Sequence, residues 1–286
     1  MRAGATPAPN EDLVLNPNHK RILGVRALEE NTEMNGGNGF SKSIRPFTAL
    51  IAGFRMLKNL EDTKQAFIIF DAIDGPQTEK NFQRFIRTDA GLALTRDNSD
   101  LKDILTDRQK LRSNLDGSLA ASFLQFTHDE HLDPEYLLSS AQTAGIDCLN
   151  LDAHRTAFMK SGFVVHDLLH VLTGYGRDPV GEACILAFTA EQMNLIGIGF
   201  FAKALALREK IANPERPIFK IVEEARKMAR RATWIPSIDF RDKMHEPLEI
   251  IRQELKIEPA ELFLKHGFAE SVKIETTIKT EYSSAA

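Results

Sequence analysis

The sequence predicts an all-α protein with a single compact multi-helix domain, and three observations lead to this prediction. The 286-residue chain contains 31 Leu but only 8 Val, and Phe supplies 18 of its 22 aromatic residues, whereas strands favour Val, Tyr and Trp. Apolar residues recur three and four positions apart, which is the period of an amphipathic helix. No run of alternating apolar and polar residues is long enough to predict a strand.

The first predicted helices lie in the N-terminal half. Pro46 opens a helix whose apolar stripe ends at Leu57. A buried helix covers residues 65–73 and ends at 74–76, and Pro76 then starts a separate helix that presents Phe82, Phe85 and Ile86 on one face. Ser99 caps a helix that extends to Leu111, after which residues 116–118 interrupt the chain. Further helices are expected at 119–127, 152–173, 179–208, 217–232 and 245–256.

Three regions are predicted along the chain. Residues 1–43 are rich in Pro, Asn and Gly and form a flexible N-terminal extension, 44–264 form the helical domain, and 265–286 form a C-terminal tail. The extension has neither the apolar core of a secretion signal nor the composition of a transit peptide, so a cytoplasmic protein is expected. A net charge of -4 argues against a general nucleic-acid binder, and two cysteines are too few for a disulfide framework.

The most apolar segment covers residues 192–202 and is too short to span a membrane, which takes roughly 20 residues. We expect Ile198, Phe200 and Phe201 to belong to the core or to the wall of an apolar cavity. Gly197 and Gly199 leave room for a neighbouring helix or for a ligand chain, and helix packing is the favoured interpretation.

The residues able to carry chemistry cluster around one predicted hairpin. His166, Asp167 and His170 converge on one side of a helix, because positions three or four apart differ by only about 60° or 40° around its axis. Asp178 and Pro179 predict the start of the next helix, whose first turn contains Glu182. Because these polar groups are costly to bury unpaired, we expect His166, Asp167, His170 and Glu182 to bind a divalent metal. Zn is the first expectation from the ligand types, with Fe(II), Mn or Co as alternatives.

Other interpretations of these residues stay open. Two His four apart also occur as a hydrogen-bonded core pair, and about 0.2 such pairs are expected by chance from 8 His. A zincin requires HExxH, but Asp167 stands at the second position. A phosphohydrolase of the His-Asp type requires a further His and Asp, for which His154 and Asp239 are the candidates. A second cluster at residues 128–131 is predicted to be a solvated turn.

At this hairpin the sequence resembles the coenzyme Q (ubiquinone) biosynthesis protein 4 family. The family's motif is HDxxH followed by eleven residues and Glu, and His166, Asp167, His170 and Glu182 match it at all four positions. The resemblance covers about residues 45–260 and leaves out the N-terminal extension. Its flanking blocks contain Gly117–Ser118, Phe123–Phe126, Gly181 with Phe188 and Gln192, Trp234, and residues 246–255.

The resemblance implies a fold and an activity. Family members are mostly helical, bind a divalent metal through the motif and hold an isoprenoid chain in an apolar lipid-binding cavity. The implied reaction is oxidative decarboxylation of a polyprenylated hydroxybenzoate, in which a hydroxyl replaces the C1 carboxylate. His166, Asp167, His170 and Glu182 would then be the metal ligands and the catalytic residues, and Phe200 and Phe201 would accept the tail. Burying each CH₂ of that tail contributes about 0.8 kcal/mol.

The resemblance also implies partners and a location. The partners are the polyprenylated benzoate or quinone intermediate, other ubiquinone-biosynthesis proteins and a membrane surface, with no nucleic acid; a homodimer is one alternative for the oligomeric state. The expected location is peripheral, on the inner face of a bacterial plasma membrane. Arg177 and the cluster Lys227, Arg230 and Arg231 either attract a carboxylate or an anionic membrane or are solvated charges, and we favour the latter.

Two classes of function fit these expectations. The first is a metal-dependent enzyme of ubiquinone biosynthesis, which four convergent ligands favour. The second is a non-catalytic scaffold that binds an isoprenoid and organises the biosynthetic complex. A relative acting on another isoprenoid is a third possibility, which accumulated intermediates in a deletion strain would distinguish.

Overall fold

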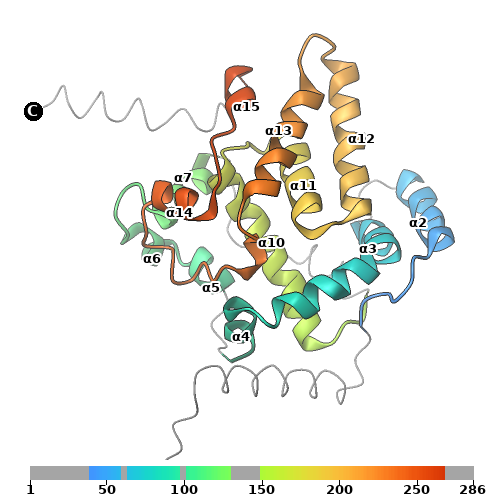
Figure 1. Ribbon diagram of the computed structural model, residues 1–286, viewed down its shortest axis with the longest axis horizontal. Coiled ribbons are helices and arrows are strands. Elements are labelled where there is room, and N and C mark those ends of the chain that lie inside the picture. Colours follow the sequence, from blue (N-terminus) through green and yellow to red (C-terminus); the bar gives the residue numbers. More distant parts are fainter. Residues whose placement is uncertain (1–38, 59–62, 97–100, 130–148, 268–286) are drawn as a thin grey trace, which may run out of the picture.

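A computed structural model describes residues 39–58, 63–96, 101–129 and 149–267 (Figure 1). In these ranges the chain forms twelve α-helices and one 3₁₀ turn, and no strand is present, which confirms the predicted all-α fold. Most of the predicted extension and tail lie outside the described residues, as do residues 130 and 131 of the predicted turn at 128–131, whose first two residues are helical. Within the described segments, none of the helices combines the length and the apolar character needed to cross a bilayer.

The helices follow one another with short connections. In chain order they are α2 (Pro46–Lys58), α3 (Thr63–Phe85), α4 (Asp89–Arg96), α5 (Leu101–Thr106), α6 (Arg108–Arg112), α7 (Leu119–Asp129), α10 (Ala153–Thr173), α11 (Pro179–Met193), α12 (Ile196–Ala212), α13 (Ile218–Arg231), the 3₁₀ turn η1 (Ile235–Ser237), α14 (Leu248–Leu255) and α15 (Glu261–Lys265).

The main core surrounds α10 and α11, which lie near the centre of the molecule in Figure 1. Leu168 and Leu172 of α10 and Ile185 and Phe188 of α11 are fully buried there. Helices α7, α12, α13, α14 and α15 supply most of the surrounding side chains. A smaller aromatic core gathers around Phe158, at the first half of α10 and the end of α3. Both cores therefore hold α10 in place along its length.

The predicted break at residues 74–76 is wrong, because α3 continues through Pro76. Proline lacks an N–H group and leaves the carbonyl four residues earlier without its helical partner. That carbonyl belongs to Ala72, and it accepts a 2.8 Å hydrogen bond from the backbone N–H of Arg45. Asp74 is buried and accepts hydrogen bonds from Gly197 N at 2.9 Å and Ile198 N at 3.0 Å. Tertiary contacts thus satisfy the groups that would otherwise end the helix.

The single helix predicted at 179–208 is also wrong, since α11 ends at Met193 and α12 begins at Ile196. Asn194 adopts the left-handed conformation (φ 53°, ψ 47°) that commonly terminates a helix. A Cβ on Gly197 would lie 2.7 Å from Asp74 Oδ2, so this glycine makes room for the carboxylate that caps α12. The helix-packing interpretation of Gly197 is therefore confirmed.

Three smaller differences complete the comparison with the predicted elements. The helix predicted up to Leu111 is divided by Asp107, whose carboxylate caps α6 through Lys110 N at 2.9 Å, while the predicted cap Ser99 lies outside the described residues. Helices α4 and α15 were not predicted. Phe200 is 70% exposed and is therefore not a core residue, whereas Phe201 packs edge-on against Phe70.

Candidate metal centre

Two sets of hydrogen bonds hold the C-terminal end of α10. Gly174 adopts the left-handed conformation (φ 78°) and its N–H donates a 2.9 Å hydrogen bond to the carbonyl of His170. Arg252 of α14 donates from Nη2 to Val171 O and from Nε to Leu172 O, both at 2.9 Å. The positive charge of Arg252 also interacts favourably with the negative, C-terminal end of the helix dipole. The last turn of α10, which contains His170, is thereby fixed.

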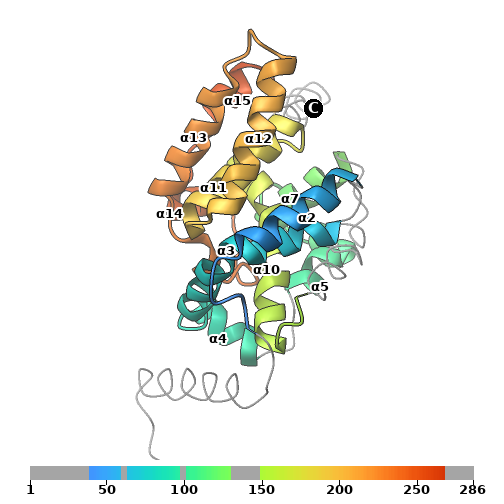
Figure 2. The same ribbon diagram turned by 90° about the vertical axis from the view of Figure 1, so that its right-hand side faces the viewer.

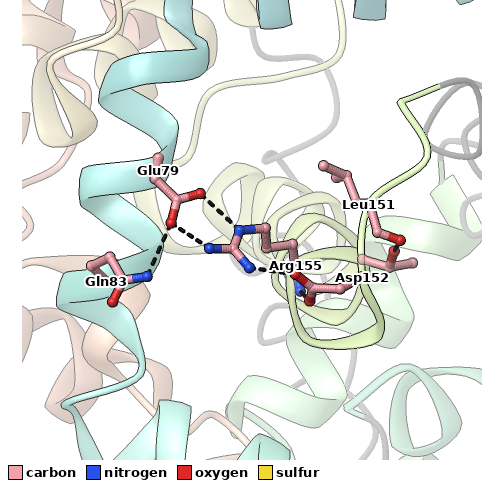
Figure 3. A network of polar contacts seen from close by, with 6 residues as sticks. Glu79, Gln83, Leu151, Asp152 and Arg155 are labelled. Carbon is pink, nitrogen blue, oxygen red and sulfur yellow. Dashed lines mark hydrogen bonds and ion pairs between the residues drawn. The ribbon is translucent and has the colours of Figure 1, made fainter. Parts of the chain in front are cut away.

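An ion-pair network holds the beginning of α10 (Figure 3). Arg155 Nε donates to Glu79 Oε2 of α3 at 2.7 Å, and the same guanidinium pairs with Asp152, the residue that caps α10. Gln83 Nε2 also donates to Glu79, at 3.0 Å. Burial raises the pKa of Glu79, but the hydrogen bonds from Arg155 and Gln83 and the charge of Arg155 together outweigh this and leave the pKa below its usual value. The network ties α3 to α10.

The turn between α10 and α11 is unusually tight. Asp178 Oδ1 accepts hydrogen bonds from Val180 N at 3.0 Å and Gly181 N at 3.2 Å, and Pro179 occupies the first helical position, as predicted. A Cβ on Gly181 would lie 1.9 Å from Gly176 O, so no other residue fits without moving the turn. This close approach places the next residue, Glu182, against the end of α10.

Three side chains meet at this hairpin. Glu182 Oε2 lies 3.4 Å from His166 Nε2, and Glu182 Oε1 lies 3.6 Å from His170 Nε2. Within the described part of the chain, His166, His170 and Glu182 form a group whose ligand atoms all lie within 4.8 Å of one another. The structure therefore brings together three of the four predicted ligands. Asp167, buried on α10, is outside this group, and its role as a ligand stays a prediction.

The hydrogen bonding of His170 indicates which of its nitrogens is free. His170 Nδ1 lies 3.0 Å from the carbonyl oxygen of Tyr175, which can only accept a hydrogen bond, so Nδ1 carries the proton. Burial lowers the pKa of His170 to about 4, so the ring is neutral and Nε2 presents a lone pair. Nε2 is buried and has no hydrogen-bond partner in the structure. Because this lone pair faces the Glu182 carboxylate, the arrangement fits a cation bound between them.

Burial and neighbouring charges also shift the pKa values of the other titratable groups of the site. Burial lowers the pKa of His166, but its hydrogen bond with Glu182 and the charges of Glu182 and Asp167 together outweigh this and raise the pKa overall. Burial raises the pKa of Glu182, but the hydrogen bond with His166 and the charges of His170, His166 and Arg177 together outweigh it, and the pKa is lowered. Burial raises the pKa of Asp167 to about 7. The site thus combines a neutral imidazole with an ionised carboxylate, the donors that Zn and related divalent metals bind.

Two site residues carry no clear sequence signal. Phe126 of α7 stacks on the His170 ring with centroids 5.5 Å apart and planes 17° apart, and Arg252 holds the end of α10. Both lie in blocks of the family resemblance, but no spacing indicates which side chain they contact. The phosphohydrolase alternative gains no support, because Asp239 pairs with Arg241 at 2.6 Å and the ligand group formed by the described residues excludes it.

The basic cluster on α13 is partly neutralised by neighbouring carboxylates. Arg230 pairs with Glu191 at 3.1 Å and with Glu223 at 2.8 Å, while Arg231 pairs with Glu258 at 2.7 Å. These contacts agree with the favoured interpretation of surface charges.

The fold and the site define a class of protein: a helical protein whose central hairpin presents a His, His and Glu cluster suited to a divalent metal. The sequence model of the family "Coenzyme Q (ubiquinone) biosynthesis protein Coq4" matches residues 45–261. The chain therefore belongs to the Coq4 family of ubiquinone biosynthesis.

Relatives in mammals agree with this assignment. The chain is 27% identical over 153 residues to proteins named "Ubiquinone biosynthesis protein COQ4 homolog, mitochondrial" from Rattus norvegicus and Mus musculus, and 26% identical over 151 residues to that of Bos taurus. The alignments cover 53–54% of this chain and 54–55% of those proteins. The chain thus spans about half the length of the curated relatives it matches.

Proposed function

We propose that this protein is a metal-dependent enzyme of ubiquinone biosynthesis that catalyses oxidative decarboxylation of a polyprenylated hydroxybenzoate. The observation that carries the proposal is the buried His170 Nε2 lone pair facing the Glu182 carboxylate, an arrangement that fits a cation. In the proposed reaction the bond between ring C1 and the carboxyl carbon breaks and CO₂ leaves. A hydroxyl takes its place in a two-electron oxidation, with molecular oxygen as the external oxidant: the carboxylic acid, O₂ and water give the phenol, CO₂ and hydrogen peroxide.

The residues of the hairpin have distinct tasks in this proposal. His166, His170 and Glu182 hold the metal, with Asp167 as the fourth predicted ligand. When bound, the metal supplies Lewis-acid or oxygen-handling chemistry beside the head group. The Tyr175 carbonyl fixes the proton on His170 Nδ1, and the Phe126 ring excludes water from one face of that imidazole. His166 and Glu182 are each 28% exposed, so they face the side from which a ligand approaches.

An exposed apolar surface gives the proposal a place for the isoprenoid. Helices α2 and α12 lie on the same side of the molecule, as both views show (Figure 2). Each presents large apolar side chains that are more than half exposed: Phe47, Leu50, Ile51 and Phe54 on α2, and Ile196, Phe200, Leu207 and Ile211 on α12. We call this set the apolar surface. Phe200 and Phe201 are proposed to receive the tail, in agreement with the large gain from burying a polyprenyl chain.

The charges around the apolar surface favour a membrane. Helix α2 contains Arg55 and Lys58 and no acidic residue, and α12 contains three basic residues and one acidic residue, although the whole chain has a net charge of -4. Helices with an apolar face and basic residues bind the interface of anionic bilayers. We therefore propose that this surface contacts a membrane peripherally, at the inner face of the plasma membrane in a bacterial host.

The enzyme proposal is tested by metal content and by pathway intermediates together. In a strain dependent on this gene, His166→Ala and Glu182→Ala are expected to lose bound metal in the purified protein and to accumulate a carboxylated polyprenyl ring. His154→Ala is the matched control, since His154 lies at the other end of α10. Normal quinone levels together with normal metal content in the first two variants would refute the proposal that the protein is a metal-dependent enzyme.

A non-catalytic scaffold is the second candidate, and the size of the apolar surface favours it. In that case the protein binds an isoprenoid intermediate and holds other ubiquinone-biosynthesis proteins together. The two candidates differ in His166→Ala: a scaffold keeps both its partners and quinone production, whereas an enzyme keeps its partners and loses the product. Affinity purification of the variant with quinone analysis separates these outcomes.

The membrane contact is tested with vesicles. Co-sedimentation with phosphatidylglycerol-containing vesicles is expected for the wild type and is expected to fall at least tenfold in the double variant Phe47→Glu/Phe200→Glu. Leu115→Glu is the control, because Leu115 is 82% exposed but lies between α6 and α7, outside the apolar surface. Equal binding by the double variant would show that another surface contacts the lipid.

A further inference from the structure

A guanidinium group lies beside the cluster formed by His166, His170 and Glu182. Arg177 is in the turn between α10 and α11, and its Nε lies 3.9 Å from Glu182 Oε1. The same oxygen lies 3.6 Å from His170 Nε2. Glu182 Oε1 therefore faces both the guanidinium and the lone pair that a bound metal would use.

The contact between Arg177 and Glu182 is loose. A separation of 3.9 Å exceeds the length of a hydrogen bond, and among the described residues no hydrogen bond donated by Arg177 is found. The Arg177 side chain is 34% exposed, compared with 1% for His170. Arg177 thus lies beside Glu182 with its side chain partly exposed, and its donors are available to a ligand.

Metal binding would change the partner of Arg177. A divalent cation held by His166, His170 and Glu182 would take up the negative charge of the carboxylate that faces the guanidinium, whether or not Asp167 is a fourth ligand. The attraction between Arg177 and Glu182 would then be weaker than in the metal-free site. The N-terminal end of α11 adds a partial positive charge at the same place. Arg177 would thus border the site without a full counter-charge, which favours an anionic ligand.

We propose that Arg177 is the anion-binding residue of this site: with a divalent metal bound, its guanidinium holds the oxyanion of the ligand's head group beside the metal. The inference rests on the proposed function and deepens it, because it assigns a residue to the head-group charge. The planar fork of a guanidinium matches a carboxylate through two parallel hydrogen bonds. Arg177 therefore selects an aromatic acid over the corresponding alcohol. A phosphate offers the same oxyanion chemistry and is distinguished below.

The inference is tested by measuring anion and metal binding separately. Zn²⁺-loaded wild type, Arg177→Gln and Arg177→Lys are titrated with 4-hydroxybenzoate, 4-hydroxybenzyl alcohol and inorganic phosphate, and the Zn²⁺ content of each protein is measured. Arg177→Gln is expected to keep its Zn²⁺ and to bind 4-hydroxybenzoate at least tenfold more weakly, with a smaller loss in Arg177→Lys. The control is Arg226→Gln, since Arg226 is 39% exposed and pairs with Glu191 on another helix.

A metal-free arm tests Arg177 independently of the proposed metal. Glu182→Gln removes the carboxylate that faces Arg177, so this variant is expected to bind 4-hydroxybenzoate at least tenfold more tightly than metal-free wild type. The gain is expected to disappear in Glu182→Gln/Arg177→Gln. A wild type that takes up no Zn²⁺ refutes the proposed metal centre, and the metal-free arm still decides the role of Arg177.

The outcomes separate the alternatives. Tighter binding of phosphate than of 4-hydroxybenzoate, lost in Arg177→Gln, supports Arg177 as the anion-binding residue and assigns a phosphate head group. Unchanged 4-hydroxybenzoate binding in Arg177→Gln overturns the inference. Loss of Zn²⁺ together with the anion also overturns it, because Arg177 would then act by positioning Glu182.

Discussion

The hairpin between α10 and α11 and the apolar surface depart from the usual distribution of side chains in opposite directions. At the hairpin, His170 is polar yet only 2% exposed, and its Nε2 has no hydrogen-bond partner. On the apolar surface, Phe200 is aromatic yet 70% exposed. Either departure is unfavourable for a chain alone in water, so each points to something that the chain binds. In this protein, the candidate functional regions are therefore those in which a polar side chain is buried without a partner or a large apolar side chain is exposed.

The largest expected difference between the two regions concerns their phenylalanines. Phe188→Ala removes a fully buried ring from α11 and is expected to lower the free energy of unfolding by about 3–5 kcal/mol. Phe200→Ala, on the neighbouring helix, is expected to change it by less than about 0.5 kcal/mol. Urea unfolding measures both. A comparable loss in Phe200→Ala would mean that another part of the protein covers this ring.

The hairpin itself is tested by a pair of glycines. Gly181→Ala places a Cβ against Gly176 O, and the overpacking is expected to cost about 1–3 kcal/mol of stability and to weaken Zn²⁺ binding at least tenfold, because the turn moves Glu182. Gly162→Ala is the control: it lies in α10, and a Cβ there meets nothing within 4 Å. That change is expected to stabilise the helix by up to about 1 kcal/mol with metal affinity unchanged. Tight Zn²⁺ binding by Gly181→Ala would show that the turn does not position Glu182.

The smallest expected effect concerns Glu79, a partly buried carboxylate that is already paired with Arg155, in contrast to His170 of the hairpin, whose Nε2 has no hydrogen-bond partner. The Arg155 hydrogen bond holds the pKa of Glu79 below its usual 4.5, so its contribution to stability is present above pH 4.5 and is lost as the pH falls below that value. Glu79→Gln is expected to lower stability by about 1 kcal/mol at pH 7 and to flatten its decline between pH 5 and pH 3. Thermal melts at several pH values measure this. Glu258→Gln, which alters an exposed pair, is expected to leave the profile unchanged.

The sequence predicted those parts of the site that depend on local structure. Asp178 and Pro179 carry the start signal of α11, and the spacing of His166 and His170 places both side chains on one face of α10. It did not predict α4 or α15, and it did not separate α11 from α12 although Asn194 carries a C-terminal signal. The incorrect prediction of a helix break at Pro76 had a different cause. No local pattern reveals that Arg45 donates to the Ala72 carbonyl, so the helix was expected to end there.

What the sequence determined by itself is the helical class and three of the four residues predicted to converge at the hairpin, His166, His170 and Glu182, because both follow from periodicity and capping over a few turns. The tertiary structure decided the rest. It brought Arg252 to the end of α10, turned the Tyr175 carbonyl toward His170 and left Phe200 facing outward. These relations join residues distant in the chain or depend on which face of a helix is covered. Packing determines them, and no spacing along the sequence encodes which neighbour a side chain meets.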